Sequence, residues 1–106
     1  MKKLRVLLVC GSGASSGFMA TNMRKALSKL GIDAEVKARS ESEIDSYLDD
    51  IDVLMIGPHL KYMVDEIEEY IEGREIVTIL MKPEYYATLN GEEAVKHMLE
   101  EYNKEK

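Results

Sequence analysis

One loop of the sequence joins its only cysteine to a run of glycines and serines, Cys10-Gly11-Ser12-Gly13-Ala14-Ser15-Ser16-Gly17. Glycines let a backbone approach a ligand closely, and successive N–H groups in such a turn can converge on an anion. A helix that follows directly adds partial positive charge at its N-terminus, and serine hydroxyls add donors. The same donors would stabilise a thiolate, which could attack an electrophilic phosphorus. The loop therefore predicts a site for a tetrahedral dianion such as phosphate, with Cys10 as its nucleophile.

Low-molecular-weight tyrosine phosphatases also place a cysteine at the head of such a loop, but they need residues that this chain lacks. They require an arginine in the pattern Cys-x5-Arg, which binds the phosphoryl group bidentately, and an Asp-Pro acid. Here Ser16 stands at the arginine position, the next arginine is Arg24, and the two prolines follow Gly57 and Lys82. A protein that only holds a phosphoryl group on cysteine needs neither group, so we favour a phosphocysteine carrier.

Two alternatives to the carrier stay open at this point. One is a phosphatase of the low-molecular-weight type. The other is a non-catalytic regulatory or anion-binding module, in which Cys10 is a small buried hydrophobic residue behind a glycine-rich turn.

The strands and helices that must position this loop can be predicted from the sequence, because four apolar, β-rich segments alternate with helical patterns. The predicted strands are residues 4–9, 34–38, 53–56 and 76–80. Residues 81–90 are predicted as an irregular loop, before a last helix that Asn90 and Glu93 open. The alternation predicts one α/β domain over residues 1–106, a four-stranded parallel sheet in the order 2-1-3-4 with helices on both faces.

In that strand order the winding reverses between the first and third strands, and a ligand crevice lies at their carboxyl ends. The rule brings residues 57–59 and 81–90 to the cysteine loop. His59, Tyr62 and Tyr86 are therefore candidates for the rim of the site. His59 is either an acid, base or second phosphocarrier or a loop histidine without a chemical role, and the tyrosines either border the site or only pack. His97 lies off the apolar stripe of its helix, and we expect it to be solvated.

Composition narrows the choice of partners. The chain has 106 residues, with 14 basic and 20 acidic side chains and a net charge of -6, which disfavours nucleic acid. A single cysteine leaves no disulfide framework, no Cys-x-x-Cys pair and no multi-cysteine zinc site, so we expect neither a metal nor a cofactor. We also expect no direct membrane insertion and no secretory leader, since the apolar runs are too short, and hence a cytoplasmic protein.

Three motifs give the chain a resemblance to a known family. They are Cys10-x-x-Gly13-x-Ser15-Ser16 after the first strand, Gly57-Pro58-x-x-x-Tyr62-Met63, and Tyr86-x-x-x-Asn90-Gly91 before the last helix. With them the chain resembles the cytoplasmic IIB component of the bacterial phosphoenolpyruvate-dependent sugar phosphotransferase system, in its lactose/cellobiose (diacetylchitobiose) branch. Two positions depart from the pattern: Ser16 stands where some members have threonine, and Ala87 where a glycine often follows the tyrosine.

The resemblance implies a specific relay. A phosphohistidine of the IIA component would phosphorylate Cys10, and the phosphocysteine would pass the group to a sugar bound by the membrane component IIC. The oxygens of that group would be held by the backbone N–H groups of Gly11, Ser12, Gly13, Ala14, Ser15 and Ser16, with help from the last two hydroxyls. IIA and IIC would be the partners, and IIC would bring the protein to the inner face of the membrane.

Overall fold

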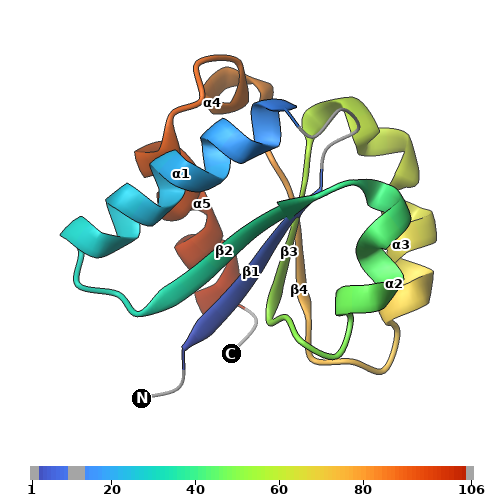
Figure 1. Ribbon diagram of the computed structural model, residues 1–106. Helices are drawn as coiled ribbons and strands as arrows, with labels where there is room; N and C mark the ends of the chain where they lie inside the picture. The colour runs from blue at the N-terminus through green and yellow to red at the C-terminus, as the bar shows by residue number, and fades with distance from the viewer. Residues whose placement is uncertain (1–2, 10–13, 105–106) are drawn as a thin grey trace.

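A four-stranded parallel sheet forms the centre of the molecule. The computed structural model describes residues 3–9 and 14–104. Its strands are β1 (Leu4–Val9), β2 (Ala34–Arg39), β3 (Val53–Ile56) and β4 (Val77–Leu80). They lie in the order β2-β1-β3-β4 (Figure 1), with every neighbouring pair parallel. The predicted fold class and strand order are therefore confirmed.

Helices cover both faces of this sheet, as predicted (Figure 1). One face carries α1 (Ala14–Lys29), the short α4 (Pro83–Ala87) and α5 (Gly91–Lys104). The other carries the 3-10 turn η1 (Glu41–Glu43), α2 (Ile44–Tyr47), the 3-10 turn η2 (Pro58–Met63) and α3 (Val64–Ile71).

Strand β1 is nearly all apolar because it contributes to a core on each side of the sheet. Val6 and Leu8 belong to the cluster under α1 and α5, where Met19, Met23 and Met98 also lie. Leu7 and Val9 belong to the cluster under α2 and α3. All four strand residues are at most 2% exposed. Side chains alternate across a strand, so a continuous apolar run is what burial on both faces requires.

The segment between β4 and α5 differs from the prediction of an irregular loop over residues 81–90. It contains the helix α4, which begins at Pro83, a residue whose fixed φ suits a first helical turn. Leu89 has a positive φ of 55° and ends this segment before α5. As predicted, Asn90 opens α5: its Oδ1 accepts a hydrogen bond from Glu93 N at 3.2 Å.

The expectation that His97 is solvated is wrong. Tyr85 Oη and His97 Nδ1 are hydrogen bonded at 2.7 Å, which fastens α4 to α5. Burial raises the pKa of Tyr85 to about 12, and burial also lowers the pKa of His97. The imidazole of His97 therefore helps to hold α4 against α5, although His97 lies beside the apolar stripe of its helix and not on it.

Candidate functional site

The carboxyl ends of β1, β3 and β4 meet at one edge of the sheet. Gly57 N, directly after β3, donates a hydrogen bond of 2.9 Å to Val9 O at the end of β1. Met81 N, directly after β4, donates one of 2.8 Å to Ile56 O at the end of β3. One predicted loop thus begins beside the last residue of β1, where the winding of the sheet reverses, and a second begins beside the last residue of β3.

Of the predicted cysteine loop, Cys10, Gly11, Ser12 and Gly13 lie outside the described residues, as do the side chains of Ala14, Ser15 and Ser16. The strand before it ends at Val9, as predicted. The 16-residue helix α1, however, begins at Ala14, inside the predicted loop, so residues 14–17 belong to the helix and not to the loop. The assignment of these residues to phosphoryl binding stays a prediction.

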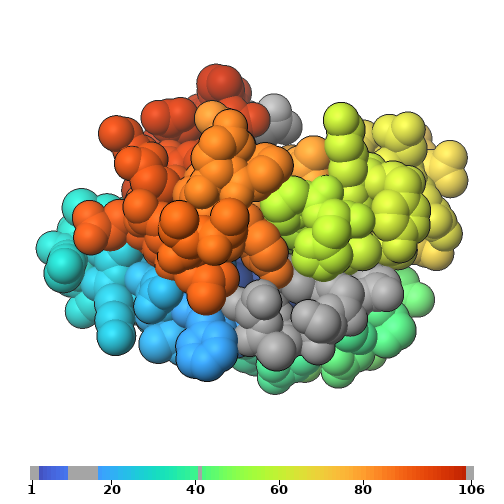
Figure 2. Space-filling model, turned by 90° about the horizontal axis from the view of Figure 1, so that it is seen from above, coloured from blue at the N-terminus to red at the C-terminus, as the bar shows by residue number. Residues whose placement is uncertain are grey.

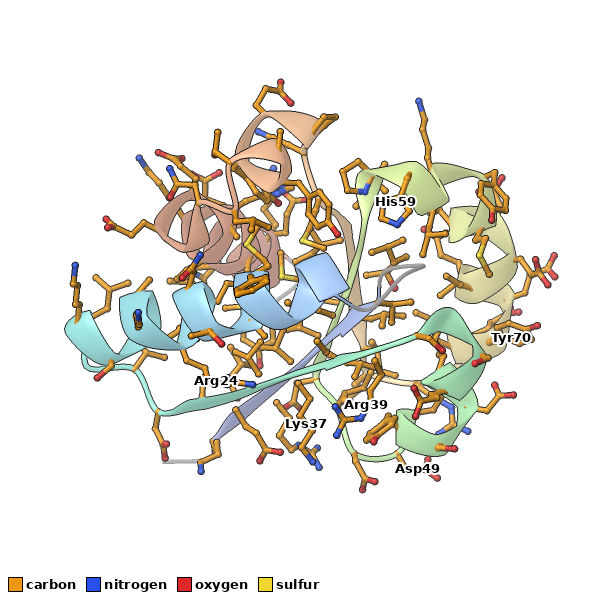
Figure 3. All side chains as sticks on the ribbon, turned by 45° about the horizontal axis from the view of Figure 1, so that its top comes forward. Arg24, Lys37, Arg39, Asp49, His59 and Tyr70 are labelled. Atoms are coloured by element: carbon orange, nitrogen blue, oxygen red, sulfur yellow. The ribbon has the colours of Figure 1, made fainter. Side chains whose placement is uncertain are left out.

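The structure brings together two of the three predicted rim residues. The rings of His59 and Tyr86 have centroids 5.8 Å apart and planes tilted by 47°. His59 comes from η2 and is exposed, whereas Tyr86 comes from α4 and is half-buried against the core cluster beneath α1. Figure 3 shows His59 at the carboxyl end of β3, where η2 begins. Tyr62 is 78% exposed, and its place on the rim stays a prediction.

Local geometry explains how His59 is held there. Gly57 is extended, with φ -61° and ψ 146°, and Pro58 starts the 3-10 turn. Leu60, only 4% exposed, anchors the turn in the core under α3, and its N–H bonds to Gly57 O at 2.9 Å. Residues 58–71 do not form one continuous helix. Leu60 has a non-helical backbone, with φ -104°, and separates the first turn of this segment from α3.

Charge is distributed unevenly between this edge and the rest of the chain. The whole sequence has 20 acidic and 14 basic residues. Residues 10–22, 57–64 and 81–90 together contain two lysines, Lys61 and Lys82, one acid, Glu84, and His59. Figure 2 looks onto this edge, with α1 from Gly17 onward in blue, η2 in yellow-green and α4 in orange. An anion at this edge meets less repulsion than the net charge of -6 suggests.

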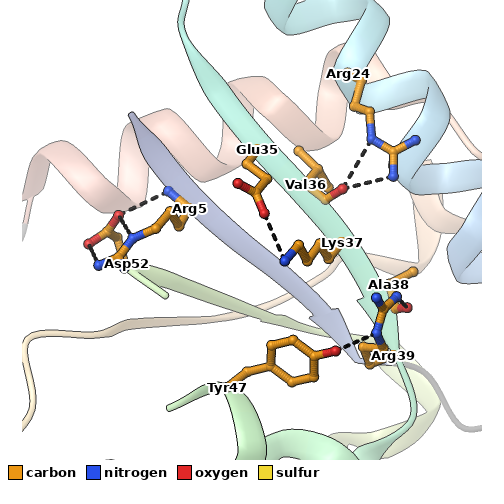
Figure 4. Close-up of polar contacts among 9 residues, drawn as sticks. All are labelled: Arg5, Arg24, Glu35, Val36, Lys37, Ala38, Arg39, Tyr47 and Asp52. Atoms are coloured by element: carbon orange, nitrogen blue, oxygen red, sulfur yellow. Dashed lines mark hydrogen bonds and ion pairs between the residues drawn. The ribbon is translucent and has the colours of Figure 1, made fainter. Parts of the chain in front are cut away.

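Two arginines that could have clamped a phosphoryl group are engaged elsewhere (Figure 4). Arg24, the first arginine after Cys10, donates through Nε and Nη2 to Val36 O at 3.0 and 2.8 Å. Arg39 is the register partner of Val9, yet it donates to Tyr47 Oη and to its neighbour's carbonyl, Ala38 O, each at 2.7 Å.

Sequence reasoning missed Arg39, because only the β1–β2 register brings it beside the end of β1. Both guanidinium groups hold the β2 edge in place, and neither supplies the bidentate clamp of a phosphatase.

Within residues 3–9 and 14–104, no group of three or more His, Cys, Asp or Glu side chains could hold a metal ion. Over the same residues, no helix has the length and apolar character needed to cross a membrane.

Comparison with known proteins agrees with this architecture. The chain is similar over 95 residues to the galactose-specific EIIB component of the PTS system of Lactococcus lactis subsp. cremoris, with 27% identity covering 85% of this chain and 88% of the relative. It is also similar over 99 residues to the oligo-beta-mannoside-specific EIIB component of Bacillus subtilis, with 25% identity covering 93% and 94%.

Two solved structures share the fold. The cellobiose-specific phosphotransferase IIB component from Borrelia burgdorferi superposes with a TM-score of 0.79 at 24% identity, covering 98% of this chain and 95% of that one. The lactose-specific IIB component domain from Streptococcus pneumoniae gives 0.81 at 18% identity, covering 95% and 99%. The family model described as "PTS system, Lactose/Cellobiose specific IIB subunit" matches residues 5–97. With nearly the whole chain matched, this protein belongs to the lactose/cellobiose-specific IIB subunits of the sugar phosphotransferase system.

Proposed function

We propose that Cys10 carries a phosphoryl group between two other components of the system. It accepts the group from a phosphohistidine of IIA and passes it to a sugar bound by the membrane component IIC. The observation that carries this proposal is the hydrogen bond from Gly57 N to Val9 O, which joins the ends of β1 and β3. That bond lies at the topological switch point of the sheet, where α/β proteins bind their ligands, and Cys10 follows Val9 in the sequence.

Both transfers balance without any further reactant. In the first, the N–P bond of the phosphohistidine breaks, an S–P bond forms at Cys10, and the thiol proton goes to the leaving imidazole. In the second, the S–P bond breaks, an O–P bond forms on the sugar, and the hydroxyl proton returns to sulfur. The protein's share of the work is to hold the phosphoryl oxygens and to lower the pKa of the thiol.

The backbone N–H groups of residues 11–16 and the Ser15 and Ser16 hydroxyls would hold those oxygens at the start of α1. Neutral dipoles bind a dianion less tightly than an arginine fork does, which suits a group that must leave again. The engaged guanidinium groups of Arg24 and Arg39 agree with a carrier and argue against a phosphatase. In this role the protein works at the cytoplasmic face of the membrane, next to IIC.

Intact-mass measurement tests the proposal directly. The protein is incubated with phosphoenolpyruvate, enzyme I, the histidine-containing carrier protein and a matching IIA. We expect a gain of one phosphoryl group that is lost in Cys10→Ser and retained in the control variants His59→Gln and His97→Gln. No gain in the wild type, with IIA shown to be phosphorylated, would overturn the carrier function. Release of phosphate from p-nitrophenyl phosphate would instead support the phosphatase.

A further inference from the structure

One of the side-chain amides in this chain precedes a glycine. The amides belong to Asn22, Asn90 and Asn103, and the sequence contains no glutamine. Asn90 is followed by Gly91, whereas methionine and lysine follow the other two asparagines. A backbone nitrogen can attack the amide carbon of the asparagine before it, and glycine hinders this attack least because it has no Cβ. The sequence therefore makes Asn90 the most reactive amide of the chain.

The fold holds this reactive pair of residues in an arrangement that opposes the attack. Asn90 N donates to Tyr85 O at 2.9 Å, and Asn90 Oδ1 accepts from Glu93 N at 3.2 Å. Gly91 is buried and lies against the backbone of Asn22 in α1. Ring closure needs the amide of Asn90 to leave Glu93 N and to turn toward the nitrogen of Gly91. The junction between α4 and α5, residues 88–91, must therefore open before the reaction can occur.

A side chain of α1 fastens this junction from outside. Asn22 Nδ2 donates to Leu89 O at 2.7 Å, and Leu89 has the positive φ of 55° at the turn from α4 into α5 (Figure 1). Solvent can reach the turn, because Asn90 is exposed and lies with Asn22 and Lys25 on a groove of about 250 Å³. Local opening of the junction, and not access of water, therefore limits the attack.

We propose that Asn90 is the site at which this protein deamidates, and that opening of the α4–α5 junction sets the rate. In the open junction the nitrogen of Gly91 forms a bond to Cγ of Asn90. The Cγ–Nδ2 bond breaks, and ammonia leaves with the proton of the Gly91 amide. Water then adds to one of the two carbonyl carbons of the succinimide ring and opens it to aspartate or isoaspartate. The inference does not depend on the carrier function.

The two products should affect the fold differently. Aspartate keeps a side-chain acceptor for Glu93 N, and its negative charge suits the N-terminus of α5. Isoaspartate inserts a methylene into the main chain directly before Gly91, where the backbone of α1 leaves no space for a Cβ. We therefore expect the purified isoaspartate form, and not the variant Asn90→Asp, to have a lower midpoint of urea unfolding than wild type. Equal midpoints would refute this consequence.

The test measures deamidation by chromatography and peptide mass spectrometry after incubation in mildly alkaline buffer. We expect the peptide that contains Asn90 to gain one mass unit at least about tenfold more slowly in the folded protein than in guanidinium chloride. Asn22→Ala removes the bond to Leu89 O and should deamidate about fivefold faster than wild type when folded, but equally fast when unfolded. The matched control Thr21→Ala removes a hydrogen bond to Gly17 O within α1 and should leave the rate unchanged.

Four results would overturn the inference. Asn90 could stay intact in the unfolded chain, or react equally fast in the folded and unfolded protein. Asn22→Ala, shown by circular dichroism to be folded, could deamidate as slowly as wild type, or no faster than Thr21→Ala. If Asn22→Ala does not fold, the comparison of folded with unfolded wild type still decides whether opening limits the reaction. Phosphoryl transfer to Cys10 is tested separately by the intact-mass experiment, so the two proposals stand or fall independently.

Discussion

Gly91, the first residue of α5, lies against the backbone of α1, and we expect Gly91→Ala to destabilise the protein. A Cβ at this position would lie 2.3 Å from Asn22 C, 2.5 Å from Asn22 O and 2.6 Å from Met23 N. Real Cβ atoms essentially never come within 3.0 Å of such neighbours. All three atoms are backbone, so no change of side-chain rotamer can relieve the contact, and the two helices would have to move apart.

The size of the effect follows from two opposing contributions. Overpacking a close-packed site ordinarily costs about 1–3 kcal/mol, and three backbone contacts at once place this site at the upper end. Alanine regains at most about 1 kcal/mol of helix propensity over glycine. The net loss should be about 2 kcal/mol in the free energy of unfolding, or about 10 °C in Tm for a domain of this size.

Gly17→Ala provides a matched control because the same substitution there should have the opposite sign. Gly17 also lies in a helix, α1, but a Cβ built on it meets, among the described residues, no atom within 4 Å beyond its chain neighbours and the backbone of its own helix. Alanine should therefore leave stability unchanged or raise it by up to about 1 kcal/mol. Urea and thermal unfolding followed by circular dichroism would measure both variants. A Gly91→Ala variant as stable as wild type would refute the reasoning, since α1 and α5 would then not need this close approach.

Four further substitutions test three contacts away from the site. Asp52→Ala removes the carboxylate that accepts hydrogen bonds from Arg5 N at 2.9 Å and from its guanidinium at 3.3 Å; it should lower the midpoint of urea unfolding, and an unchanged midpoint would contradict this. Tyr85→Phe removes the bond to His97 and should cost about 1 kcal/mol of unfolding free energy at pH 7.5. The pKa of His97 in the folded protein lies below its ordinary value of 6.5. The free energy of unfolding should therefore be highest above pH 6.5 and should fall as the pH drops below that value. In urea titrations at several pH values, His97→Gln should reduce this fall. Arg24→Met uncovers an edge carbonyl of β2 and should cause concentration-dependent association in size-exclusion chromatography, where a strictly monomeric profile would refute edge protection.

Much of the fold could be predicted because its pattern is local. The strand Leu4–Val9 was predicted with its bounds, since its last four residues are buried on alternate faces of the sheet and must all be able to pack in a core. The strand order followed from β-α alternation and the right-handedness of crossovers. The helix α4 escaped prediction, because five residues are too few to show a helical period.

The site could be predicted only in part, for a different reason. Residue type indicated that Cys10 and the glycine-serine loop could perform phosphoryl chemistry, and the topology rule indicated which other loops lie at the same edge. Neither could indicate that the rings of His59 and Tyr86 lie next to each other. Neither could indicate that the guanidinium groups of Arg24 and Arg39 donate hydrogen bonds to carbonyls of β2.

The sequence by itself determined the alternation of strands and helices, their two-sided burial and the reactive groups available, because hydrophobic period and side-chain chemistry are properties of neighbours along the chain. Only the tertiary structure decided which polar side chains meet. Those contacts join residues from separate elements, such as His97 on α5 and Tyr85 on α4. They depend on the register and packing of whole helices against the sheet, so no local pattern records them.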